Sequence, residues 1–315
     1  MIDLGFDRPA ALLLAPLAGA SLVYLLGRVR ARVSSLASAL SPVEEGAAWR
    51  LFAASVAARA VFVVLIAVFL ANPYVVRTSE VELTPDSPLL YRAEAEIVIL
   101  IDVSKSMSYQ LGLSPSERID AALGVVSDLV QEMSSNDTLV LVAFAGDAET
   151  LYEGPPEGAA EILESLEANR SYTSIGDALV YALARSRSSG KPVALILLSD
   201  GGNNGGTDPL EAARLLRDAG VPILVVQVGS GPSSNPELME RIAGESGGEF
   251  RSLGELEPAV VSSLAEELAR EAKYVALESA GKLRVDIEVR DYETPRNVVA
   301  ALAAVALAIA LAGGA

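Results

Sequence analysis

The 315-residue chain contains no cysteine and no histidine. It can therefore form no disulfide, thiolate metal site, Ser-His-Asp triad or histidine-ligated zinc. Positive charge is scarce too, with 24 Lys and Arg against 41 Asp and Glu and a net charge of −17. Because a nucleic-acid-binding surface must be cationic, nucleic acid is excluded as a partner class. Chemistry is left to carboxylates, hydroxyls, amides, lysine, arginine or a hard metal ion.

Apolar and charged residues are segregated, since the chain is 51% hydrophobic and 21% charged. Three runs carry no charge: 9–27, 60–76 and 297–315. Each is 17 to 19 residues long, and a helix of about 17–20 apolar residues covers a bilayer core about 30 Å thick. We therefore expect three transmembrane helices. A cleaved signal peptide is disfavoured for the first run because its arginines, Arg28 and Arg30 among them, follow the run instead of preceding it.

The distribution of charge predicts how the chain crosses the membrane. Arginines dominate the loop between the first two runs, and the positive-inside rule then makes that loop cytoplasmic. The segment 77–296 would lie on the extracytoplasmic side of a cell membrane, and 297–315 would return the C-terminus inward. This segment holds 18 Lys and Arg against 37 Asp and Glu. The acidity therefore belongs to a soluble part that is long enough for one α/β domain with a full core.

Within 96–276, short apolar runs alternate with amphipathic stretches. Strands are expected at 97–101, 139–144, 193–198 and 221–228, and helices at 116–133, 175–187, 209–218, 236–245 and 255–276. Nearly continuous apolar strands are typical of parallel sheets that are covered on both faces. The sequence thus predicts an α/β fold, a doubly wound and mostly parallel sheet with helices on both faces, in addition to the transmembrane helices.

Two juxtamembrane segments flank this domain, at 77–95 and 277–296, and each is expected to be a strand or a linker. Residues 283–290 alternate apolar and charged side chains, which is the period of a half-buried strand. We expect this strand to pair with 75–83 beside the membrane.

Short oxygen-bearing side chains follow two of the predicted strands and precede one predicted helix. Asp102, Ser104 and Ser106 follow the first strand, Asp200 follows the third, and Thr173 lies just before a helix. If the turn after the first strand is extended, its alternate side chains face one point. Ligands of such sheets bind at the carboxyl ends of the strands. Although each residue alone would be read as a cap or a turn, together they suit Mg²⁺, or else Mn²⁺ or Ca²⁺.

Four further polar residues are expected at the rim of this site: Lys105, Asp177, Asn203 and Asn204. A cation at Lys105 could tune the affinity for the metal or simply be solvated. The two asparagines could equally well shape a turn.

The pattern Asp102-x-Ser104-x-Ser106, followed by Thr173 and by Asp200 in Leu-Leu-Ser-Asp-Gly, resembles the metal-ion-dependent adhesion site (MIDAS) of von Willebrand factor A (vWA) domains. The resemblance covers about 96–276. It implies that the three hydroxyls contact the metal, and that the two carboxylates supply charge directly or through water. It also implies that a carboxylate from an Asp or Glu of a protein partner takes the open coordination position.

The layout of two N-terminal spans, an A domain and a C-terminal span is similar to that of the membrane-anchored Bat aerotolerance proteins, BatA among them. This likeness implies a multi-protein complex with a MoxR-type AAA+ ATPase and with other vWA or membrane subunits. A cytosolic ATPase would reach only residues 28–59 in the topology above.

Two other functions stay open at this point. The chain could be a structural subunit of a membrane complex in which the metal only stabilises the fold, or a metal-dependent hydrolase. The hydrolase is disfavoured because a dehalogenase-type phosphatase needs an acid where Ser104 stands, and because no histidine can activate a serine. No phosphate-binding Gly-x-x-x-x-Gly-Lys loop is present, so the chain is not itself an ATPase. We therefore predict a protein that is not an enzyme.

Overall fold

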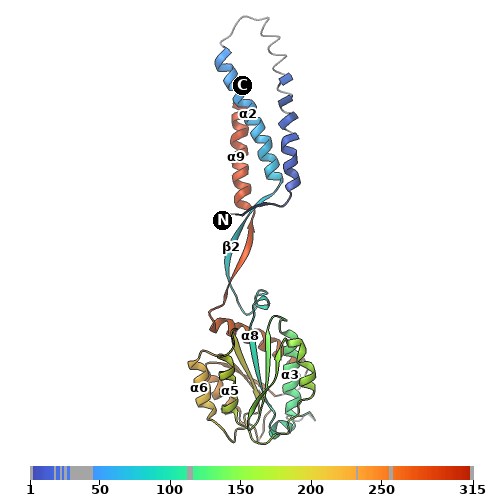
Figure 1. Cartoon of the computed structure of the whole chain (residues 1–315), viewed down its shortest axis with the longest axis vertical. Helices are drawn as coiled ribbons and strands as arrows, with labels where there is room; N and C mark the ends of the chain where they lie inside the picture. The colour runs from blue at the N-terminus through green and yellow to red at the C-terminus, as the bar shows by residue number, and fades with distance from the viewer. Residues whose placement is uncertain are drawn as a thin grey trace. The chain divides into compact units, whose positions relative to one another are not determined.

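The computed structural model describes residues 3–17, 19–21, 23–24, 27–28, 45–111, 116–231, 233–254 and 258–312. The chain divides into two compact units. One unit combines Met1–Val81 with Asp286–Ala315, and the other is Glu82–Val285. The first contains apolar helices and a small sheet, and the second contains a large sheet flanked by helices (Figure 1).

The unit Glu82–Val285 is built on a six-stranded sheet of order β5-β4-β3-β6-β7-β8. All neighbours pair in parallel except β4 and β5, which are antiparallel. Every residue of β3, β6 and β7 is buried, as the continuous apolar runs predict. The strands are β3 (Glu96–Asp102), β4 (Thr138–Phe144), β5 (Ala148–Gly154), β6 (Val193–Ser199), β7 (Ile223–Val228) and β8 (Glu249–Leu253).

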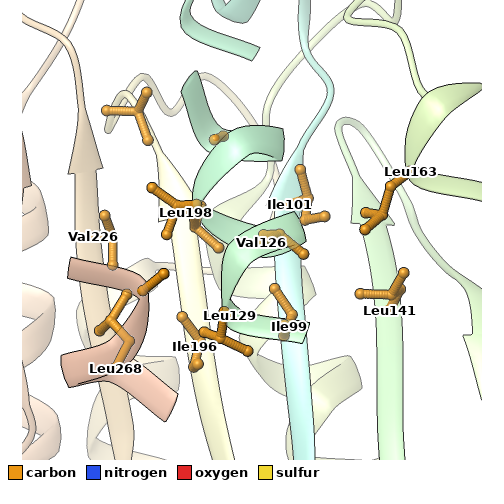
Figure 2. Packing of buried hydrophobic residues seen from close by; sticks show 14 of the residues in the cluster. Ile99, Ile101, Val126, Leu129, Leu141, Leu163, Ile196, Leu198, Val226 and Leu268 are labelled. Carbon is orange, nitrogen blue, oxygen red and sulfur yellow. The ribbon is translucent and has the colours of Figure 1, made fainter. Parts of the chain in front are cut away.

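Helices cover both faces of this sheet, which confirms the predicted α/β fold. On one face Ile99 and Ile101 of β3 belong to the same buried cluster as residues of α3 and α8. Figure 2 shows Val126 and Leu129 of α3 and Leu268 of α8 lying over the strands. On the other face the alternate β3 side chains pack with α5, α6 and α7. The helices are α3 (Arg118–Glu132), α4 (Ala160–Glu164), α5 (Ile175–Ser186), α6 (Pro209–Asp218), α7 (Pro236–Ser246) and α8 (Pro258–Ser279), with short 3-10 turns η2 (Leu90–Arg92), η3 (Lys105–Ser108) and η4 (Pro156–Gly158).

The two edge strands β5 and β8 are absent from the sequence prediction. Every residue of β5 is partly or fully exposed, and its pairing with β4 shifts register between Leu141 and Val142. Strand β8 has only five residues, of which one is buried. Edge strands of this kind lack the apolar run by which the central strands were recognised.

The other unit contains a three-stranded sheet of order β1-β2-β9. Strand β2 (Pro73–Glu82) lies between β1 (Asp3–Phe6) and β9 (Arg284–Asp291). This confirms the expected pairing of 75–83 with 283–290. Strand β1 was not predicted, and it joins antiparallel to β2 with Asp3 opposite Val76.

Helices α2 (Glu45–Leu70) and α9 (Glu293–Ala312) of this unit lie side by side (Figure 1). Ser55 Oγ donates a hydrogen bond to the carbonyl of Ala310 at 3.1 Å. The guanidinium of Arg296 lies over the ring of Phe69, 5.0 Å from its centroid.

The structure supports one of the three predicted spans by length and composition. Among the described residues only α9 is long and apolar enough to cross a membrane, with a mean hydropathy of 1.8 and 11% of its apolar window buried. The predicted span 60–76 is wrong at its end. Helix α2 stops at Leu70, Asn72 takes a left-handed conformation with φ of 53°, and β2 begins at Pro73.

The first predicted span, 9–27, starts as the 3-10 helix η1 (Pro9–Leu13) and lies partly outside the described residues. The last three residues of the predicted span 297–315 also lie outside them.

Candidate metal site

The site begins at the carboxyl ends of β3 and β6, which are parallel neighbours. Asp102 is the last residue of β3 and is fully buried. Its Oδ2 accepts a hydrogen bond from Ser199 Oγ at 2.6 Å, and its Oδ1 accepts one from the backbone N–H of Ser104 at 2.9 Å. Burial raises the pKa of Asp102 to about 6 although both hydrogen bonds act to lower it. A buried carboxylate of this kind is stabilised by any cation that comes beside it.

The two serines converge, but not through an extended turn as expected. Ser104 is extended, with φ of −68° and ψ of 158°, and the chain then enters η3, which contains Ser106. The two hydroxyl oxygens nevertheless lie 3.1 Å apart. The 3-10 turn therefore brings them together by a different backbone path.

Asp200 follows β6 and is fully buried beside these serines. Its Oδ1 accepts a hydrogen bond from the backbone N–H of Gly202 at 2.9 Å. A methyl group added to Gly202 would lie 3.1 Å from Asp200 Oδ1 and 3.8 Å from Ser106 Oγ. The carboxylate and the hydroxyl therefore border one small space that Gly202 leaves open.

Thr173 lies on a third loop that the other two loops hold in place. The backbone N–H of Lys105 donates to the carbonyl of Arg170 at 2.8 Å. On the other side, the backbone N–H of Thr173 donates to Asn204 Oδ1 at 2.9 Å, and Thr173 is buried. Tyr172 between them has a φ of 66°, an uncommon conformation for a residue with a side chain. Strained backbone of this sort is typical of functional sites.

Three of the four predicted rim residues connect loops. Asn203 Oδ1 accepts from the backbone N–H that begins α5, at 2.9 Å, and Asn204 holds Thr173 as described. Asp177 Oδ1 accepts from the backbone N–H and from the hydroxyl of Thr207, at 3.0 and 2.6 Å, and these bonds lower the pKa of Asp177. Lys105 is exposed. The asparagine side chains therefore join two loops at the rim and do not close a local turn, while the ammonium of Lys105 is open to solvent.

Arg118 at the start of α3 is a member of the site that was not predicted. Its side chain is 3% exposed, and its Nη1 donates to Asp200 Oδ2 at 2.6 Å. The same guanidinium donates to Ser233 Oγ at 3.1 Å, to the carbonyl of Ser230 at 3.2 Å and to that of Ser106 at 3.4 Å. One buried cation thus joins three loops around Asp200.

A signal for Arg118 was present in the helical pattern. Arg118 lies four and seven residues before Ala122 and Val125, so it shares the buried stripe of α3. A cation at such a position must find a partner inside the protein. Ser199, which was also missed, gave no comparable signal because it closes an apolar strand.

The donor set fits a hard divalent cation. Among the described residues no group of three or more acidic side chains could hold a metal. A cation here would rely on hydroxyl oxygens together with the carboxylates of Asp102 and Asp200. Such an all-oxygen set suits Mg²⁺ or Mn²⁺ better than zinc or copper.

The family model of the von Willebrand factor type A domain matches residues 96–267, more than half of the chain. The chain therefore belongs to the von Willebrand factor type A family. No curated protein sequence matches it.

Several solved structures are similar to the chain. An aerotolerance-related membrane protein from Bacteroides fragilis, with multiple mutations to serines, is 26% identical with a TM-score of 0.48, and the match covers 55% of this chain and 98% of that one. The conserved hypothetical protein BatB from Bacteroides thetaiotaomicron is 24% identical with a TM-score of 0.49, covering 57% and 99%. The ArnB paralog VWA2 from Sulfolobus acidocaldarius is 26% identical with a TM-score of 0.43, covering 61% and 47%.

Proposed function

We propose that this chain is a membrane-anchored vWA protein that binds a protein partner through a Mg²⁺ ion. Asp102, Ser104, Ser106, Thr173 and Asp200 would hold the ion, directly or through water. The observation that supports this most is the meeting of three loops at the carboxyl end of the sheet. The Ser104 and Ser106 hydroxyls lie 3.1 Å apart there, and a carboxylate borders the same space.

The donor set leaves a coordination position for the partner. Mg²⁺ demands octahedral geometry with about six oxygen ligands, and it is bound through few carboxylates. If each of the five proposed side chains contributes one oxygen, directly or through a water, one of the six coordination positions is left. An Asp or Glu of the partner would complete it with an anionic oxygen.

The surroundings of the site also suit a protein partner. Tyr172 is 70% exposed and Tyr109 is 49% exposed, and both lie beside the loops of the site. Exposed tyrosines are enriched at protein interfaces. Lys105 adds an exposed positive charge that would attract an acidic segment.

The membrane anchor is proposed on the basis of the apolar helices. Helix α9 meets the length and composition of a span, and α2 contributes a shorter apolar helix, Ala54–Leu70. The extracytoplasmic position of the domain follows from the arginine-rich loop before α2. The association with a MoxR-type ATPase and other Bat-type subunits stays a prediction.

Titration of Mn²⁺ into the full chain in detergent, with free Mn²⁺ measured by electron paramagnetic resonance, tests the metal site. We expect saturable binding that Thr173→Ala weakens. Thr150→Ala is the matched control, because this threonine lies in β5 and its hydroxyl bonds to Tyr181. Equal effects of the two substitutions would contradict the proposed ligand set.

Partner binding separates this function from a purely structural role. Crosslinking in membranes of the source cells should show a metal-dependent partner that EDTA and Asp102→Asn both release from a folded protein. If the metal only raises the melting temperature and no crosslinked partner depends on it, the structural role is correct.

A further inference from the structure

We propose that Arg118 is a resident cation of the metal site, which holds Asp200 in place and keeps the affinity for the divalent ion low. The proposal rests on the proposed function, since it concerns the same site. The shortest contact of the buried guanidinium is the 2.6 Å hydrogen bond from Nη1 to Asp200 Oδ2.

Arg118 reduces the charge that Asp200 can offer to a metal. One carboxylate oxygen, Oδ2, accepts from Arg118, and the other, Oδ1, accepts from the backbone N–H of Gly202. Both oxygens therefore already have donors. The guanidinium contacts Asp200, and Asp102 interacts electrostatically with Asp200, so these three buried charges sum to a single negative charge. A divalent cation there stays under-neutralised, which increases its attraction for a partner carboxylate.

The same side chain organises the loops around Asp200. Its hydrogen bonds reach Ser106 in η3 and Ser230 and Ser233 in the loop after β7. Gly229, with φ of 74°, makes room for it, because a methyl group there would lie 3.0 Å from Arg118 Nε. The Nε atom is buried and has no hydrogen-bond partner among the described residues. The guanidinium is thus placed by its contact with the carboxylate and the loops.

Arginine cannot lose its proton inside a protein, so this cation is permanent. A metal that enters the site must bind beside a positive charge and cannot displace it by deprotonation. Arg118 should therefore lower the affinity for a metal and at the same time stabilise the metal-free domain.

Arg118→Gln tests both effects in the full chain in detergent, with Mn²⁺ as the probe. We expect Mn²⁺ to bind at least about 10-fold more tightly than to the wild type, because a buried like charge within a few ångströms is removed. The metal-free variant should melt at a lower temperature, and saturating Mn²⁺ should narrow that difference. Arg214→Gln is the matched control, since it removes an exposed arginine charge that pairs with Glu245 away from the site, and it should change the affinity by less than about threefold.

If Arg118→Gln fails to fold without metal, Arg118→Lys distinguishes the effect of the positive charge on metal affinity from the effect of the side chain on folding. Lysine keeps the charge but not the planar fork, so we expect an affinity within about threefold of the wild type and a lower melting temperature. A tenfold change in the affinity of Arg118→Lys would overturn the proposal.

The outcomes also distinguish this proposal from the proposed function. If the wild type binds Mn²⁺ and Arg118→Gln binds it equally or more weakly, the resident-cation role is wrong and the metal site stands. If only Arg118→Gln binds Mn²⁺, the resident-cation role is correct and metal bridging by the wild type is wrong. If neither binds, both proposals fail.

Discussion

The two ends of the large sheet each contain a buried ion pair, and the two pairs have very different surroundings. At the carboxyl end Arg118 and Asp200 are 3% and 0% exposed, with 2.6 Å between Nη1 and Oδ2. At the amino end Lys273 and Asp137 are 6% and 2% exposed, with 2.9 Å between Nζ and Oδ1. Burial and distance alone would make the two pairs equivalent.

The hydrogen bonds around each carboxylate differ. Asp137 accepts backbone N–H groups from Ala95 and Ser134, both at 3.1 Å, so the pair fastens the start of β3 to the turn before β4 and to α8. No hydroxyl hydrogen bond to Asp137 is among its described contacts. The pair at the carboxyl end lies among serine hydroxyls, and within the described part of the chain Arg118 Nε has no hydrogen-bond partner. The surroundings of a buried pair, more than its burial, indicate whether it only stabilises the fold or also serves a site.

The largest effect is expected at the amino end. Lys273→Met leaves the Asp137 carboxylate buried without its cation, which should lower the free energy of unfolding by about 3–5 kcal/mol. Mn²⁺ affinity should not change. Urea unfolding of the full chain measures the first effect, with Lys191→Met as a control at a partly exposed pair with Glu94, where about 1 kcal/mol or less is expected. A tenfold change in Mn²⁺ affinity would remove the distinction between the two ends.

The second prediction concerns the carboxyl end, where function and stability should oppose each other. Asp102→Asn should weaken Mn²⁺ binding by more than about 100-fold, since even the partners of metal ligands contribute about 10–100-fold. The pKa of Asp102 is raised in the fold by burial. The charged form is therefore disfavoured there, and stability falls as the pH rises from the unfolded pKa to about 6.

At pH 7.5 the metal-free Asp102→Asn variant should accordingly be no less stable than the wild type. Thermal unfolding by circular dichroism in EDTA measures this. A variant that is strongly destabilised without metal would assign Asp102 the same stabilising role as Asp137.

The third prediction concerns the loops that hold the site. Asp177→Ala removes both hydrogen bonds from Thr207 and should lower the free energy of unfolding by about 1–2 kcal/mol. Thr207 lies in the same loop as Asn204, which holds Thr173. Mn²⁺ binding should therefore also weaken, by about 10-fold. Ser165→Ala is a control, since it breaks a local bond within its own turn. If Asp177→Ala changes stability alone, Asp177 belongs with the stabilising contacts.

These comparisons also show what could be read from the sequence. The buried strands β3, β4, β6 and β7 were predicted because continuous apolar runs require burial on both faces. Asp102 and Asp200 were placed together because the carboxyl ends of parallel strands meet. Arg118 was missed because only its position on the apolar stripe of α3 distinguishes it from an ordinary charged residue of an amphipathic helix.

In the apolar unit, the end of helix α2 was predicted incorrectly. The absence of charge in 60–76 did not show where α2 would end, because hydropathy does not distinguish the last turn of a helix from the first residues of a strand. Asn72 and Pro73 carried that information. In the same unit, Arg290 pairs with Asp7 at 3.4 Å and lies 4.7 Å from the centroid of the Tyr74 ring.

The smallest effect is expected at a partly exposed cluster on α8. Burial and a hydrogen bond with Glu249 raise the pKa of Glu271 from its usual 4.5 to about 7. The folded protein therefore holds a proton that the unfolded chain has lost, and stability falls as the pH rises from about 4.5 to 7. Glu271→Gln should flatten this dependence by less than about 1 kcal/mol, because solvent screens the cluster. Chemical unfolding at pH 5 and pH 7.5 measures it, and an unchanged slope would contradict it.

A crystal structure of the protein grown with Mn²⁺, with anomalous scattering collected at the manganese edge, tests the central claim most directly. We expect one strong peak at the carboxyl end of β3, about 2.1 Å from the hydroxyl oxygens of Ser104 and Ser106, and no peak beside Asp137. A crystal saturated with Mn²⁺ whose only peak lies elsewhere, or that has a peak at Asp137, would contradict the claim that the carboxyl end binds a metal and the amino end only stabilises the fold.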